Sequence, residues 1–281
     1  MGRLFRGVKA RARHLLALRE SLVEEEILGR VYHVRRGTVR PQPDYDDAWF
    51  LACALHARII FDIGANVGYN ALLAARQGNV DQVVLVDANA VALSAAAENL
   101  IRNGVGRKAR FVRAFVADSV HDVVTFWTVG KGAAGSMYAS HAQTASKHAS
   151  HVSVSTVTVD YLSEEYGLLP DFVKVDVEGA EREVLAGSAA CARHEKTRFL
   201  VEMHSNQDLS MSENAADVLS WCKSVNYRAW YLKEHVMLEG PEMIRHRGRC
   251  HLLLQPAPWP LPSWLQRIEQ SAPLEHATIS A

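Results

Sequence analysis

Between residues 58 and 254, short apolar runs alternate with stretches of helical pattern, and this alternation limits the fold more than any other feature. Short apolar runs bounded by turn residues are typical of buried strands. Strands that alternate with helices form a mainly parallel sheet with helices on both faces. The expected strands are Ile59–Phe61, Val83–Val86, Phe111–Val116, Val123–Val129, Val152–Val159, Phe172–Val175, Phe199–Glu202, Tyr227–Leu232 and Cys250–Leu254, the last two as an antiparallel pair. The expected helices are Tyr69–Gln77, Ala90–Arg102, Glu181–Ala186 and Ala215–Ser224.

The two ends of the chain differ in pattern from this central part. We interpret residues 1–57 as a helical N-terminal extension, residues 58–255 as the α/β domain, and residues 256–281 as a proline-rich tail with a short helix near Trp264–Gln270. Residues 1–19 carry six Arg and Lys side chains and no acid. These cations form either an arm for an anionic surface or the solvated face of a helix packed on the domain.

The composition argues against several classes of protein. Lys and Arg total 31, as do Asp and Glu, so the net charge is zero and offers no bulk attraction to nucleic acid. The four cysteines form no CxxC pair, which argues against a zinc knuckle or a redox dithiol. No apolar run approaches the roughly 20 residues that span a bilayer, and no signal-peptide core is seen. We therefore expect a cytoplasmic protein without a transmembrane segment.

The most informative motif, DIGANVG, spans residues 62–68, where it follows the first expected strand and opens a helix. Glycines let the backbone turn sharply and approach a ligand closely, and the start of a helix offers unpaired N–H groups. Such a turn at the carboxyl end of a first strand is typical of a nucleotide site. The motif is neither GxGxxG nor a GK[ST] phosphate loop. The expected ligand contacts here are Asp62, Gly64, Ala65, Asn66 and Gly68.

Acidic residues after the next two strands extend this candidate site. Asp87 ends the second strand, 19 residues after Gly68 by their numbers, where an acid can bind both ribose hydroxyls. Its neighbours Ala88 and Asn89 belong to the same expected site. Asp118 follows the third strand, where an adenine edge can be recognised. The alternative for Asp87 and Asp118 is a helix N-cap or a turn.

A second set of candidate residues stands at the ends of two later strands. Asp176 and Glu178 follow one apolar run, and Glu202 and His204 end the next. Acids at such positions can simply stabilise a helix N-terminus. A histidine placed beside them is a candidate general base. The same four side chains could instead bind Mg²⁺ or Mn²⁺, although we favour a site without a metal.

Histidines also gather in the segment Gly130–His151, which is rich in Ser, Ala and Gly. A metal site there would use His141, His148 and His151. Their spacing does not suit one helix face, and no cysteine joins them. We therefore expect a flexible loop that covers the substrate.

The DIGANVG loop, Asp87 and the run VKVDVEGAE over residues 173–181 together resemble the FkbM family of S-adenosylmethionine (SAM) dependent methyltransferases. The resemblance covers roughly residues 58–254. It implies the class I methyltransferase fold, a Rossmann-like seven-stranded sheet with a reversed last strand. It further implies that the loop at 62–68 binds the methionine part of SAM, that Asp87 binds the ribose, and that Asp118 lies near the adenine. Gly135–Met137 loosely resembles a Ser-containing segment of the family.

The family mostly methylates hydroxyl groups, so we expect O-methylation of a small molecule, sugar or glycan. An alcohol is a poor nucleophile while protonated, and a base should therefore assist. We expect His204 or Asp176 to take the proton and Glu178 to orient the acceptor. The oligomeric state stays open, with a homo-oligomer among the options.

Three alternatives compete with this interpretation. A nicotinamide oxidoreductase needs GxGxxG after the first strand, where this chain has GxNxG. A methyltransferase with a nitrogen acceptor, such as a nucleic-acid base, usually shows an Asn/Asp-Pro-Pro-aromatic turn, where this chain has Asp-Val-Glu-Gly. A non-catalytic SAM-fold binding protein would show erosion of the loop at 62–68, and none is seen.

Overall fold

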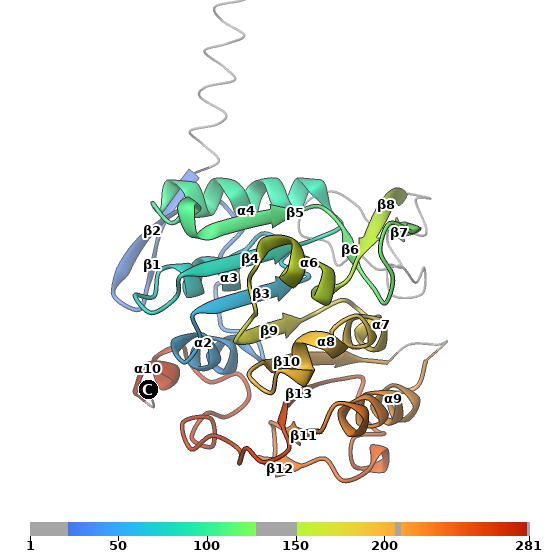
Figure 1. Cartoon of the computed structure of the whole chain (residues 1–281). Helices are drawn as coiled ribbons and strands as arrows, with labels where there is room; N and C mark the ends of the chain where they lie inside the picture. The colour runs from blue at the N-terminus through green and yellow to red at the C-terminus, as the bar shows by residue number, and fades with distance from the viewer. Residues whose placement is uncertain (1–21, 128–150, 206–208, 280–281) are drawn as a thin grey trace, which may run out of the picture.

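The central feature of the computed structural model is a mixed sheet of eight strands, built from the described residues 22–127, 151–205 and 209–279 (Figure 1). The strands run in the order β12-β11-β13-β10-β9-β3-β4-β5. Their bounds are β3 Ile59–Ile63, β4 Gln82–Val86, β5 Ala109–Val112, β9 Phe172–Val175, β10 Arg198–His204, β11 Tyr227–Tyr231, β12 Val236–Met237 and β13 Arg249–Pro256.

Strand direction confirms the expected α/β class. The pairs β4–β5, β3–β4, β3–β9 and β9–β10 are parallel, whereas β13 is antiparallel to both β10 and β11. The reversed strand therefore lies where the resemblance placed it. The sheet exceeds the expected seven strands by the two-residue edge strand β12.

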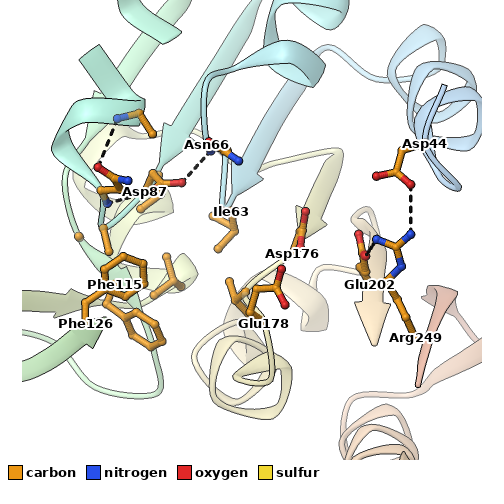
Figure 2. A pocket seen from close by; sticks show the side chains of 18 of the residues that line it. Asp44, Ile63, Asn66, Asp87, Phe115, Phe126, Asp176, Glu178, Glu202 and Arg249 are labelled. Carbon is orange, nitrogen blue, oxygen red and sulfur yellow. Dashed lines mark hydrogen bonds and ion pairs between the residues drawn. The ribbon is translucent and has the colours of Figure 1, made fainter. Parts of the chain in front are cut away.

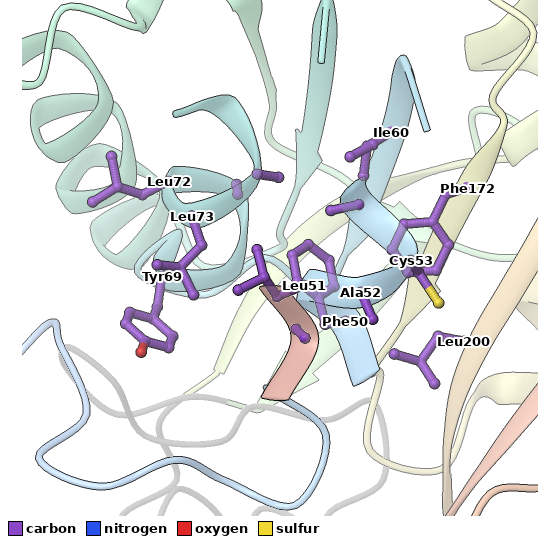
Figure 3. Packing of buried hydrophobic residues seen from close by; sticks show 14 of the residues in the cluster. Phe50, Leu51, Ala52, Cys53, Ile60, Tyr69, Leu72, Leu73, Phe172 and Leu200 are labelled. Carbon is purple, nitrogen blue, oxygen red and sulfur yellow. The ribbon is translucent and has the colours of Figure 1, made fainter. Parts of the chain in front are cut away.

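Helices cover both faces of the sheet, as the alternating pattern predicted. Successive strand residues point to opposite faces, so that Ile60 joins the core under α2, α3 and α4 while Phe61 joins the core under α6, α7, α8 and α9. Figure 3 shows Phe50, Leu51 and Leu73 packed in the first of these cores. The helices are α2 Asp47–Leu55, α3 Tyr69–Ala75, α4 Ala90–Arg102, α6 Val159–Tyr166, α7 Glu181–Ala186, α8 Ala189–Arg193, α9 Met211–Ser224 and α10 Glu275–Ile279, with short 3₁₀ turns at Gly106–Lys108 and Pro241–Met243. None of these helices is long and apolar enough to cross a membrane.

The expectation of a helical extension over residues 1–57 is wrong for its middle part. Strands β1 (Leu22–Ile27) and β2 (Arg30–Arg35) form an antiparallel hairpin there. Leu28 and Gly29 both have positive φ angles, as a two-residue hairpin turn requires. Along β2 only every second residue is buried, which is strand rather than helix periodicity. The basic residues 1–19 lie outside the described residues.

The C-terminal tail packs into the main core. Leu261, Leu265 and Ile268 are buried in the core cluster that contains α2. The indole Nε1 of Trp49 donates a hydrogen bond of 2.8 Å to the carbonyl of Ile268. The expected helix near Trp264–Gln270 is wrong, because these residues form turns and the helix is α10.

A small three-stranded sheet lies beside the carboxyl ends of the parallel strands (Figure 1). Its strands are β6 (Phe115–Val116), β8 (His151–Val157) and β7 (Val123–Trp127), in that order. The expected single strand Phe111–Val116 is thus divided between β5 and β6. The proposed covering loop, with Gly135–Met137, His141 and His148, lies outside the described residues.

Candidate active site

A cavity of about 200 Å³ opens at the carboxyl ends of β3, β4, β9 and β10. Its wall runs from the aromatic pair Phe115 and Phe126, past Asp87, to Asp176 and Glu178 (Figure 2). The wall continues to Glu202, Arg249 and Asp44. Most of the predicted site residues therefore meet in one place, as expected for strands whose carboxyl ends share one edge of a sheet.

The glycine loop after β3 has the backbone conformation that the motif predicted. Gly64 has a φ of +80°, and a Cβ atom there would lie 1.8 Å from the carbonyl oxygen of Asp176. The loop can therefore contact the turn after β9 only with glycine at this position. At Gly68, with a φ of +74°, a Cβ would lie 2.6 Å from the Cβ of Ala96, so glycine lets α3 approach α4 closely.

Asp87 links the glycine loop to the start of α4. One oxygen, Oδ2, accepts a 2.7 Å hydrogen bond from the backbone N–H of Asn66, and Oδ1 accepts one of 2.7 Å from Asn89 (Figure 2). Asn89 in turn caps α4 by accepting from the N–H of Val91 and Ala92. Burial raises the pKa of Asp87 to about 6. A carboxylate oxygen has more than one lone pair, so Asp87 can still accept bonds from a diol.

The end of the cavity at the small sheet is aromatic rather than acidic. The rings of Phe115 and Phe126 are 6.2 Å apart at 53°, and both side chains are buried. An apolar, aromatic wall of this kind suits contact with an adenine ring. Asp118 is exposed and is not among the residues that line the cavity. Sequence reasoning missed the two phenylalanines because they resemble ordinary core residues of a strand.

Asp176 stands where the cavity meets a buried cation. Its Oδ2 accepts a 2.8 Å hydrogen bond from Nζ of Lys174, which is only 3% exposed. Burial lowers the pKa of Lys174, but Asp176, Asp46 and Asp62 outweigh that effect and raise it, so the ammonium stays charged. Burial also raises the pKa of Asp176, against the influence of Lys174.

His204 lies behind the cavity wall among three glutamates. Its Nδ1 donates to Oε1 of Glu181 over 2.8 Å, and its Nε2 lies 3.5 Å from Glu178 and 3.4 Å from Glu202. Burial opposes the charge, yet the bonds with Glu181 and Glu202 raise the pKa of His204 well above its ordinary value. An imidazolium cannot accept a further proton, so the geometry favours a positioning role over that of general base.

Three of the four residues considered for a metal do converge. Ligand atoms of Asp176, Glu202 and His204 lie within 4.8 Å of one another, and Glu178 is outside this set. Cations of the chain already balance these acids, because Lys174 binds Asp176 and Nη1 of Arg249 lies 3.0 Å from Glu202. A metal ion would have to displace these ion pairs and the His204 proton, so the arrangement favours a site without one.

The wall also contains residues that sequence reasoning did not find. Arg40 and Asp44 come from the segment between β2 and α2, and Arg249 begins β13. The Arg249 guanidinium donates to Asp44 over 3.1 Å and lies 4.3 Å from the ring centroid of Tyr45. Asp44 and Arg249 are 205 residues apart in the chain, and no local pattern predicts such a contact.

The fold and the cavity define a class I, SAM-type methyltransferase. Residues 62–229 match the methyltransferase FkbM domain, a range that covers more than half of the 281 residues. The chain therefore belongs to the FkbM family of SAM-dependent methyltransferases.

Solved structures give a more distant likeness. The FkbM methyltransferase from Methylobacillus flagellatus KT matches with a TM-score of 0.46 and 13% identity over 71% of this chain. This chain spans 43% of that protein. A SAM-dependent methyltransferase from Agrobacterium tumefaciens matches with a TM-score of 0.46 and 13% identity, over 84% of this chain and 70% of that protein. TYW2 from M. jannaschii, in complex with AdoMet, matches with a TM-score of 0.45 and 11% identity, over 83% of this chain and 84% of that protein. No curated protein matches the chain.

The residues present fit SAM. The cavity joins an aromatic end at Phe115 and Phe126, the carboxylate of Asp87 and an acidic end at Asp176 and Glu178. Both oxygens of the buried Asp62, which lies beneath the loop, lack a hydrogen-bond partner among the described residues. An unpartnered buried carboxylate calls for a cationic or donor group from a ligand.

Proposed function

We propose that this methyltransferase acts on a hydroxyl group of a small molecule, sugar or glycan. One observation carries the proposal: the carboxylates of Asp176 and Glu178 line the cavity on the far side of Asp87 from Phe115 and Phe126. An acceptor that enters at that end meets groups that accept hydrogen bonds and protons. A hydroxyl acceptor needs both, because it must be oriented and must lose its proton.

The residues that would hold SAM follow the length of the cavity. Phe115 and Phe126 would contact the adenine, Asp87 would bind the ribose hydroxyls, and the loop from Asp62 to Gly68 would hold the methionine part. Bound SAM supplies an electrophilic methyl group on a sulfonium. The protein supplies alignment, which can contribute about 7–11 kcal/mol to such a reaction.

Asp176 is our candidate for the residue that takes the acceptor proton. Its carboxylate lines the cavity, and burial raises its pKa toward the range in which a base works best at neutral pH. Glu178 lines the same wall and has a φ of +53°, a conformation that non-glycine residues rarely adopt. We assign to Glu178 the orientation of the acceptor. His204 holds Glu178 and Glu202 in place.

The test is a transfer assay with SAM carrying a labelled methyl group and matched pairs of acceptors. Each pair consists of a sugar and the same sugar with one hydroxyl replaced by an amine, and each is run with and without EDTA. We expect labelled methyl on oxygen, unchanged by EDTA, and lost in Asp176→Asn. Label on nitrogen, or turnover that EDTA abolishes, would contradict the proposal. Arg58→Gln is the control, because Arg58 lies at the opposite end of β3 with an exposed side chain.

A further inference from the structure

Arg40 lies outside the residues that match the FkbM domain, yet it borders the candidate donor site on two sides. It lines the cavity described above and also a second cavity of about 280 Å³ across the glycine loop. The second cavity is walled by residues 37–41, Asp62, Tyr69 and Asn70. Gly64, Asn66 and Asp176 line both cavities, so the two meet at the loop and Arg40 stands at their junction.

The Arg40 guanidinium is fixed on one side and open on the other. Its Nη1 donates to Asp47 and lies 3.6 Å from Asp44 and 3.9 Å from Asp46. Its Nε and Nη2 make no hydrogen bond with any of the described residues, and the side chain is 34% exposed. The guanidinium thus has N–H groups available for a planar anion while the acids hold it in position.

The other two cations of the site differ from Arg40 in this respect. Lys174 binds Asp176 and is almost fully buried, and Arg249 contacts both Glu202 and Asp44. Among the three cations of the site in the described residues, Arg40 is therefore the one with N–H groups still available next to the glycine loop.

Two residues that line the same second cavity carry buried acceptor atoms without a donor. Both carboxylate oxygens of Asp62 and Oδ1 of Asn70 are buried and have no hydrogen-bond partner among the described residues. Unpartnered acceptors call for an ammonium group, and the free N–H groups of Arg40 call for a carboxylate. A ligand that carries both groups on one carbon is an α-amino acid, which is the end group of SAM.

We propose that Arg40 binds the α-carboxylate of the methionine part of SAM, and that residues 37–41 form a wall of the donor site. The proposal rests on the proposed function, because it requires SAM in the first cavity. It assigns a substrate-binding role to a segment that precedes the FkbM domain match. A domain boundary at residue 58 would then cut through the donor site.

The experiment compares two ligands that differ in the amino-acid part. S-adenosylhomocysteine has the α-carboxylate and α-ammonium groups, whereas 5′-methylthioadenosine keeps the nucleoside and sulfur but lacks both. Calorimetric titration measures the Kd of each for the wild type, Arg40→Gln, Arg40→Lys and the control Arg58→Gln. A double variant, Arg40→Gln with Asp47→Asn, covers the case in which the buried Asp47 is destabilised by losing its cation.

We expect Arg40→Gln and the double variant to bind S-adenosylhomocysteine roughly 10- to 100-fold more weakly, the usual effect of losing hydrogen bonds to a charged group. Their Kd for methylthioadenosine should stay within about twofold of the wild type. Arg40→Lys should recover part of the loss, because it keeps a charge without the fork.

An equal loss for both ligands would show that Arg40 only supports the fold of the loop, and no loss for either would show that it does not contact the donor. Both results would overturn the inference while leaving the proposed function intact. A folded wild type that binds neither ligand would instead contradict the proposed function itself.

Discussion

Replacing Asp62 by asparagine should change stability and ligand binding in opposite directions. The carboxylate is 1% exposed and has no hydrogen-bond partner among the described residues. Burial raises its pKa from the ordinary 3.8 to about 6, with Lys174 opposing the rise. The free protein therefore holds an acid whose ionised form is disfavoured by folding.

The size and the sign of the effect follow from these two pKa values. An acid whose pKa is raised by folding does not lower the free energy of unfolding at a pH below its unfolded pKa, because it is protonated in both states. Above its folded pKa it lowers the free energy of unfolding by the full amount. Stability therefore falls as pH rises from about 4 to about 6. At 1.36 kcal/mol per unit, the full cost is about 3 kcal/mol, of which roughly half is already present at pH 5. The buried amide of Asp62→Asn has its own cost, but that cost does not vary with pH.

The assay is thermal unfolding of the ligand-free wild type and Asp62→Asn at pH 5.0 and pH 7.5. Relative to the wild type, the variant should gain about 1–2 kcal/mol in free energy of unfolding between the two pH values, which corresponds to roughly 2–3 °C in Tm for a chain of this length. The same variant should bind S-adenosylhomocysteine more weakly at pH 7.5. A Tm difference that stays constant with pH, or that moves against the variant, would refute the reasoning.

Four further substitutions test other parts of the structure. Gly64→Ala should abolish binding of S-adenosylhomocysteine and destabilise the fold by roughly 2 kcal/mol or more, since its methyl would collide with the backbone after β9; calorimetry and thermal melts measure both. Phe115→Ala should weaken binding of S-adenosylhomocysteine and of adenosine about tenfold, because an aromatic contact with the adenine is lost. Asp176→Asn should lower kcat by about 10²- to 10⁴-fold with little change in the Kd for S-adenosylhomocysteine. Trp49→Phe should lower stability by about 1–2 kcal/mol in denaturant titrations, because the carbonyl of Ile268 loses its donor.

Sequence reasoning predicted the parts of the fold that depend on local pattern. The parallel strands followed from apolar runs of the right length, and the glycine loop followed from its place between Ile59–Ile63 and α3. Asp87 and Asp176 could be placed at one edge of the sheet because they end parallel strands. Each of these inferences uses only neighbours in the chain and the rule that parallel strands end together.

Two local signals in the sequence indicate elements that the hydrophobic periodicity alone does not. Tyr32 and Val34 alternate with exposed residues directly after the Leu28-Gly29 turn, which is a strand pattern beside a turn signal. Ser210 and Glu213 form a capping box, which places the start of α9 at Met211 rather than at Ala215.

Other features depend on contacts between distant parts of the chain. Arg40 and Asp44 reach the site from an irregular segment, and Arg249 arrives from the last strand of the sheet. The protonation of His204 depends on Glu181, 23 residues away, and on the burial of both groups. No spacing rule predicts such contacts, because they follow from how the completed fold packs.

The most direct test of the account is calorimetric titration of S-adenosylhomocysteine into the wild type and into Asp87→Ala, with folding of both checked by circular dichroism. The account requires micromolar binding to the wild type and a loss of at least tenfold in the variant, because Asp87 both holds the glycine loop through Asn66 and faces the cavity. A folded wild type that does not bind, or an Asp87→Ala variant that binds equally well, would contradict the placement of the donor between the glycine loop and the aromatic pair Phe115 and Phe126.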